Sequence, residues 1–128
     1  MNTYTYKKGD FEQRPWGCWQ VYDVFPSAVV KKICIHPGGR LSYQRHEHRV
    51  ERWIVVEGTA TVTIDGKLMQ LAYGESIEIP CRCLHRLANA TDSNLVVIEI
   101  QHGNILSELD IERIDDDYSR IKTSDSPS

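Results

Sequence analysis

The sequence predicts an all-β protein, folded as a closed antiparallel sandwich or barrel. Segments rich in Val, Ile and Thr recur at short intervals, Pro, Gly or polar turns separate them, and no internal segment sustains a helical period. The chain has 128 residues and a formal net charge of −3, so it has the size of one ordinary domain and no basic excess for binding nucleic acid. We therefore expect a single β domain over residues 1–120.

The expected strands follow one another along the chain. They cover residues 28–35 (AVVKKICI), 52–65 (RWIVVEGTATVTID), 75–80 (ESIEIP) and 94–101 (NLVVIEIQ). Asp65-Gly66 lies between TATVTI and KLMQLA, and it predicts a hairpin because both residues tolerate positive φ. The segment 106–120 (LSELDIERIDDDYSR) is expected to form a short helical C-terminal segment, followed by a disordered polar tail over residues 121–128.

Nothing in the sequence indicates secretion or membrane insertion. The amino terminus lacks the apolar run of a signal peptide, and no stretch approaches the ~20 apolar residues of a membrane span. The four cysteines, Cys18, Cys34, Cys81 and Cys83, form no C-x-x-C pair. We therefore expect a cytoplasmic protein whose cysteines are thiols, with no membrane and no nucleic-acid partner.

Polar side chains gather in residues 38–58 (GGRLSYQRHEHRVERWIVVEG), a segment otherwise typical of a strand. Alternation puts Ser42, Gln44 and His46 on one face, and a continued strand would add His48. If that face is the inside of a barrel, each group buried without a partner costs about 1–3 kcal/mol. Gln, His and Glu donors suit a divalent transition metal, which would satisfy them.

Two spaced motifs resemble those of the cupin superfamily. The first reads Gly38-x5-Gln44-x-His46-x4-Glu51-x6-Gly58, and the second reads Gly74-x5-Pro80-x4-His85-x3-Asn89, with Arg82 where the motif has glycine. Further stretches at residues 14–17 (RPWG), 30–60, 79–89 and 96–120 are similar to the isomerase domain of type II mannose-6-phosphate isomerases. In most of those relatives the domain follows a sugar-nucleotide pyrophosphorylase domain.

The resemblance implies a cupin double-stranded β-helix, a jelly-roll barrel, with a metal near its mouth. Its ligands would be Gln44, His46, Glu51 and His85, so that the second motif supplies the fourth donor. The expected cofactor is one divalent transition metal, with zinc first and manganese, cobalt, nickel or iron as alternatives. The structural alternative is a hydrogen-bonded polar cluster in a cupin without metal.

The activity that the resemblance implies is aldose–ketose isomerisation of mannose 6-phosphate and fructose 6-phosphate. This chemistry needs a proton shuttle and cations for the phosphate. Glu99 and Lys31 are the predicted catalytic residues; Lys31 is equally consistent with a solvated strand position, and Glu99 with cross-strand pairing. The predicted substrate-binding residues are Arg14, Arg86, Gln101, Arg120 and His48.

Other functions remain open at this stage. The altered residues Arg52, Arg82 and Ile105 would also suit a non-catalytic, metal-containing sugar-binding or sensory module, and a metal-dependent dioxygenase would use similar ligands. The expected ligand is a small-molecule sugar phosphate. We also expect a homodimer, because amino-terminal strands such as YTYKK can cover exposed sheet edges in a partner.

Overall fold

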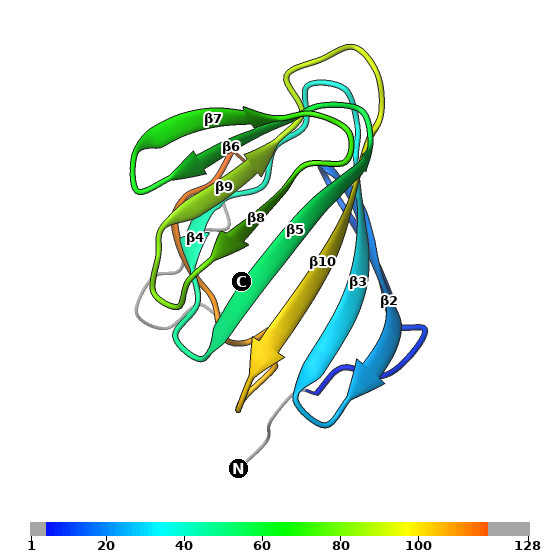
Figure 1. The fold of residues 1–128 in the computed structure, drawn as a ribbon, viewed down its shortest axis with the longest axis vertical. Helices are drawn as coiled ribbons and strands as arrows, with labels where there is room; N and C mark the ends of the chain where they lie inside the picture. The colour runs from blue at the N-terminus through cyan, green and yellow to red at the C-terminus, as the bar shows by residue number, and fades with distance from the viewer. Residues whose placement is uncertain (1–4, 118–128) are drawn as a thin grey trace.

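A computed structural model describes residues 5–117, and it confirms the all-β class (Figure 1). The described residues contain strands and turns but no helix, and so no helix that could cross a membrane. The strands are β1 (Phe11–Arg14), β2 (Gly17–Phe25), β3 (Ala28–Ile35), β4 (Tyr43–Arg45), β5 (Arg49–Glu57), β6 (Ala60–Ile64), β7 (Lys67–Leu71), β8 (Ser76–Ile79), β9 (His85–Ala88), β10 (Leu95–Gly103) and β11 (Glu112–Asp115).

The strands form two antiparallel sheets. One has the order β1-β2-β3-β10-β5-β8 and the other has the order β11-β4-β9-β6-β7, so strands distant in sequence lie side by side in both. In β2, β3, β5 and β10 buried and more exposed residues alternate, which is the pattern of a sheet with one face in the core. The expected strand 28–35 coincides with β3, and 75–80 and 94–101 overlap β8 and β10.

The predicted strand 52–65 is two strands. β5 ends at Glu57 and β6 begins at Ala60, with Gly58 between them at φ 84°. A Cβ atom on Gly58 would lie 2.4 Å from the backbone oxygen of Asn94, so only glycine fits this turn. The hairpin predicted at Asp65-Gly66 is confirmed: it joins β6 to β7, with φ of 46° and 82°.

The predicted C-terminal helical segment is wrong for the residues that the structure describes. Residues 108–109 form a turn, and β11 pairs with β4. Ser107 and Asp110 give the backbone other partners: Ser107 Oγ accepts from the Leu109 amide at 3.1 Å, and the Asp110 carboxylate accepts from the amides of Glu47 and His48. These tertiary contacts override the local helical pattern. The predicted tail, residues 121–128, lies outside the described residues.

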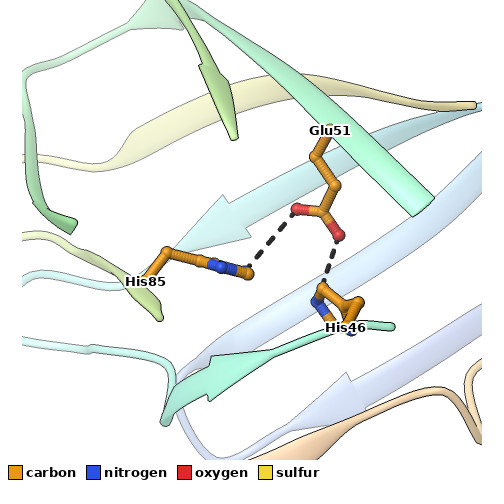
Figure 2. A group of neighbouring side chains, drawn as sticks. All are labelled: His46, Glu51 and His85. Carbon is orange, nitrogen blue, oxygen red and sulfur yellow. Dashed lines mark ion pairs between the residues drawn. The ribbon is translucent and has the colours of Figure 1, made fainter. Parts of the chain in front are cut away.

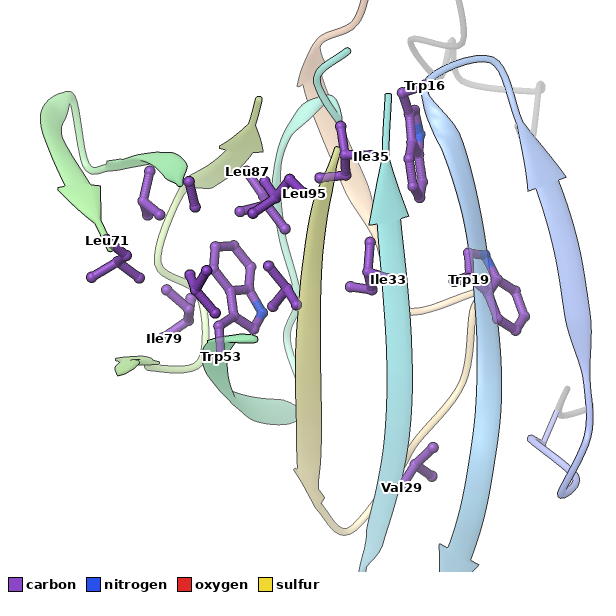
Figure 3. Close-up of a cluster of buried hydrophobic side chains, with 14 of the residues drawn as sticks. Trp16, Trp19, Val29, Ile33, Ile35, Trp53, Leu71, Ile79, Leu87 and Leu95 are labelled. Atoms are coloured by element: carbon purple, nitrogen blue, oxygen red, sulfur yellow. The ribbon is translucent and has the colours of Figure 1, made fainter. Parts of the chain in front are cut away.

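The hydrophobic core fills the space between the two sheets (Figure 3). Trp53 and Leu95 come from the six-stranded sheet and Leu87 from the five-stranded one, and all three are almost fully buried. Trp16 and Trp19 extend the core along β2 toward the amino-terminal strands. The core therefore anchors β5, β9 and β10, the strands that carry the polar residues of the predicted site.

Arg82, which replaces the motif glycine, has a left-handed backbone with φ 63°. Its amide donates to the backbone oxygen of His46 at 2.7 Å, so this turn supports the predicted metal site. Because a left-handed conformation costs about 1–2 kcal/mol for a residue with a Cβ, we expect Arg82→Gly to be at least as stable as wild type. Arg82→Val should lower the free energy of unfolding by about 1–2 kcal/mol. Urea unfolding midpoints test this, and equal stability of all three proteins would contradict it.

Candidate functional site

Most of the predicted site residues line one cavity, between the inner faces of the two sheets. Polar and charged side chains converge there from the amino-terminal strand, from both sheets and from the segment before β11. The lining includes Arg14, Trp16, Trp19, Lys31, Ser42, Gln44, His46, Arg49, Glu51, Trp53, Glu99, Glu108 and Arg113.

Three potential metal ligands meet in this region: His46, Glu51 and His85 (Figure 2). His46 follows β4, Glu51 lies on β5 and His85 begins β9, and all three are buried. One ligand atom from each lies within 4.8 Å of the others. The Nε2 atom of His46 is 3.2 Å from Glu51 Oε2, and that of His85 is 3.9 Å from Glu51 Oε1. Both imidazoles thus present the same nitrogen to one carboxylate.

Backbone carbonyls fix the tautomers of the two histidines. His46 Nδ1 donates to the backbone oxygen of Asp110 at 2.5 Å, and His85 Nδ1 donates to that of Cys83 at 2.9 Å. Because a carbonyl can only accept, Nε2 keeps its lone pair when the ring is neutral. His85 Nε2 is buried and has no hydrogen-bond partner among the described residues. An unsatisfied, inward-facing imidazole nitrogen is suited to ligate a metal.

The protonation states also suit metal binding. Burial, with Arg49 adding to it, lowers the pKa of His46 to about 3, and burial lowers the pKa of His85 as well. Burial raises the pKa of Glu51, but the charge of Arg49 opposes this most strongly, and that pKa lies well below its usual range. The site therefore presents two neutral imidazoles and one carboxylate at neutral pH, as divalent transition metals require.

Gln44 adds an amide to this donor set. It faces His85 directly across β4 and β9, lines the same cavity, and its Oε1 accepts from Ser42 Oγ at 3.1 Å. The four predicted ligands therefore converge, and their chemistry fits one divalent transition metal.

Arg49 is a central residue that the sequence interpretation missed. Its Nε donates to Glu51 Oε2 at 2.8 Å, and its Nη2 donates to His46 Nε2 at 3.1 Å. Nη1 donates to the backbone oxygen of Ser107 at 3.1 Å. The guanidinium is buried, and each of its three nitrogens donates a hydrogen bond. Arg49 thus balances the charge of Glu51 and holds it beside His46.

Glu99, a predicted proton shuttle, lies on β10 beside the metal ligands. Its carboxylate accepts from Trp53 Nε1 at 3.2 Å and from Gln101 Nε2 at 2.7 Å, and the same Trp53 nitrogen donates to Glu51 Oε1 at 3.0 Å. Burial and the nearby Glu51 raise the pKa of Glu99 to about 8. Gln101 is fully buried next to Glu99 and orients its carboxylate, and it is not among the residues that line the cavity.

Lys31 and Arg14 share one carboxylate at another wall of the cavity. Lys31 Nζ donates to Glu108 Oε2 at 2.9 Å and lies 4.1 Å from the ring centroid of Trp19, and Arg14 Nη2 is 3.5 Å from Glu108 Oε1. The Tyr6 hydroxyl also donates to Glu108. Burial lowers the pKa of Lys31, but Glu108 and Tyr6 outweigh it and raise that pKa above its usual value. Lys31 is therefore a cation at neutral pH.

Besides Gln101, two predicted substrate-binding residues that the structure describes, Arg86 and His48, do not line this cavity. Arg86 follows His85 on β9, points to the other side of the sheet, and binds the backbone oxygens of Leu41 and Asp115 at 2.9 and 3.0 Å. His48 is exposed, because the chain bends after His46. Arg120 lies outside the described residues.

A family model described as "Mannose-6-phosphate isomerase C-terminal" matches residues 2–116. The chain belongs to this family. The chain is 49% identical over 107 residues to the alginate biosynthesis protein AlgA of Pseudomonas aeruginosa. It is 44% identical over 108 residues to the mannose-1-phosphate guanylyltransferase of Escherichia coli K12. Both alignments cover 84% of this chain but only 22% and 23% of the relatives, so the chain spans less than a quarter of their length.

Solved structures confirm the predicted cupin fold. An RmlC-like cupin from Shewanella frigidimarina superposes with a TM-score of 0.65 at 20% identity, over 80% of this chain and 92% of that one. Identity at this level bears on the fold alone. The double-stranded β-helix expected from the two motifs is therefore correct.

The relatives overturn the function that the sequence motifs predicted. The sequence motifs predicted a free isomerase that interconverts mannose 6-phosphate and fructose 6-phosphate, with a non-catalytic sugar-binding or sensory module as the alternative. That prediction is wrong. The relatives are named for guanylyl transfer and alginate biosynthesis, and this chain matches under a quarter of each. The family to which the chain belongs is enzymatic.

Proposed function

We propose that this chain is the metal-dependent cupin domain of a mannose-1-phosphate guanylyltransferase system, in which it binds a mannose phosphate and transfers protons on it. The observation that carries this proposal is the convergence, in one cavity, of a donor set, a buried carboxyl group and cations. The identity to the guanylyltransferase relative supports the association with guanylyl transfer.

Gln44, His46, Glu51 and His85 would hold the metal. When bound, a divalent ion supplies Lewis acidity for the oxygens of the sugar. Glu99 would accept the proton from the sugar and return it, because Trp53 and Gln101 hold its carboxyl group beside the proposed metal ligands. Lys31 and Arg14 would attract the phosphate, since both are cations of the cavity lining and share a single carboxylate, Glu108.

Hydrogen exchange on the sugar tests this function. The protein loaded with zinc, manganese or cobalt is incubated with mannose 6-phosphate in deuterium oxide, and the C2 proton signal is followed by NMR. We expect metal-dependent loss of that signal. Mannose 1-phosphate should bind without exchange, because its anomeric carbon is blocked. Binding of neither sugar with any metal would contradict the proposed function.

Association with a guanylyltransferase is tested separately. The E. coli relative, with the segment that matches this chain deleted, is mixed with this chain and passed over a size-exclusion column. We expect the two to elute together if the cupin domain docks on the transferase part. Separate elution at micromolar concentrations would contradict that part of the proposal.

A homodimer remains a prediction. β1 is an edge strand of its sheet, and Phe11 on it is 53% exposed, so a second copy could pair with this edge. Tyr6, from the amino-terminal segment expected to reach a partner, is instead buried in its own chain. Light scattering at micromolar concentration should give twice the chain mass, and a monomer mass would contradict the prediction.

A further inference from the structure

Cys18 and Cys34 face each other on neighbouring strands. They are direct partners in the β2–β3 register, and each lies between two buried residues of its strand. Both side chains are therefore on the outer face of the six-stranded sheet, where they are partly exposed, and β2 and β3 run side by side in Figure 1. None of the residues assigned to the metal site lies on this face.

The spacing of the pair matches that of a disulfide. Directly opposed residues of antiparallel strands have Cα atoms about 4.5–5.5 Å apart, and disulfides span about 4.4–6.8 Å. The sulfur atoms can thus bond without a change in strand register.

A cation stands beside the pair. Lys32 lies two residues before Cys34 on the same face, and its charge interacts with both thiols. Burial and the neighbouring Cys18 raise the pKa of Cys34 above its usual value, and Lys32 offsets part of this rise. A lysine at this position favours the thiolate, which is the form that attacks a disulfide.

We propose that Cys18 and Cys34 are a modification site that a small-molecule disulfide, such as oxidised glutathione, converts reversibly into an intramolecular cross-strand disulfide. This inference is independent of the proposed metal and sugar site.

The reaction proceeds by two exchanges. One cysteine thiolate attacks a sulfur of the small disulfide, which forms a mixed disulfide and releases one small thiol. The second cysteine thiolate then attacks the protein sulfur of that mixed disulfide, forms the Cys18–Cys34 bond and releases the second small thiol. The protein loses two electrons and two protons, and the small disulfide is reduced to two thiols.

Thiol counting and peptide mapping test the proposal. The reduced full chain is incubated with oxidised glutathione at about pH 8.5, where thiolates form readily, then alkylated, digested and analysed by mass spectrometry. We expect the reactive thiols to fall from the four of the free chain to two, with the Cys18 and Cys34 peptides linked in a monomer. Reduction with dithiothreitol should restore all four.

The other two cysteines provide the matched control. In a Cys81→Ser/Cys83→Ser variant the thiol count should fall from two to none, whereas a Cys18→Ser/Cys34→Ser variant should form no internal link. Cys34→Ser alone should retain a stable glutathione adduct on Cys18, because the resolving thiol is gone. The proposal is overturned if wild type keeps both thiols free, retains glutathione on either of them, or links them only between two chains.

Discussion

Glu51→Gln is expected to lower the free energy of unfolding by about 3–5 kcal/mol, because it leaves a buried cation without its counter-charge. In the wild type, Glu51 Oε2 accepts from Arg49 Nε at 2.8 Å and Oε1 accepts from Trp53 Nε1 at 3.0 Å. Glutamine keeps the shape but has only one acceptor oxygen, so one of these donors would face an NH2 group. Urea unfolding of the chelator-treated proteins measures the change.

An exposed ion pair supplies the control for this prediction. Arg52 and Glu78 lie 2.9 Å apart with about half of each side chain exposed (49% and 52%), so Glu78→Gln should cost less than about 1 kcal/mol. The double variant Arg49→Met/Glu51→Gln should recover part of the loss, since neither member of this pair then carries a buried, unpaired charge. A loss for Glu51→Gln as small as that for Glu78→Gln would show that the buried pair does not support the site.

Glu99→Gln is expected to slow deuterium exchange on mannose 6-phosphate by a factor of about 10² or more, while the sugar phosphate still binds. Glutamine preserves the shape of Glu99 and can still accept one hydrogen bond, but it cannot take up a proton. Parallel NMR exchange and calorimetric binding measurements, both with metal, separate the two effects.

Lys31→Met provides the contrasting variant. Because Lys31 is one of the cations of the cavity, its loss should weaken sugar-phosphate binding by about 1.5–3 kcal/mol rather than abolish proton transfer. If Glu99→Gln keeps full exchange and Lys31→Met loses it at saturating sugar, the role assigned to Glu99 is wrong and Lys31 is the better candidate.

The alternation of side chains along a strand is sufficient to predict which residues of the first cupin motif point into the barrel. Ser42, Gln44 and His46 are all buried, as the period of a strand requires. The pattern fails after His46, because the Asp110 carboxylate binds the amides of Glu47 and His48 and the chain bends there. The bend turns His48 outward and Arg49 inward, which explains why Arg49 was missed.

Other parts of the site depend on contacts that sequence patterns do not contain. Glu108 and Asp110 lie in the segment before β11 and reach Lys31 and His46 from positions 77 and 64 residues away along the chain. The strand or helix periodicity of a sequence does not predict such a long-range contact. Arg86 is adjacent to the inward-facing His85 in β9, so strand alternation alone predicts that Arg86 points to the other side of the sheet.

The most direct measurement is the metal affinity of wild type compared with His85→Ala. Both proteins are stripped with chelator, dialysed and titrated with zinc by isothermal calorimetry, and their metal content is measured after gel filtration. His85 Nε2 is buried and has no hydrogen-bond partner among the described residues, so alanine removes a metal donor without breaking a described hydrogen bond of that atom. We expect about one zinc ion per wild-type chain and an affinity at least about 100-fold lower for His85→Ala. Wild type that binds zinc no better than His85→Ala would contradict the metal centre on which the proposed function depends.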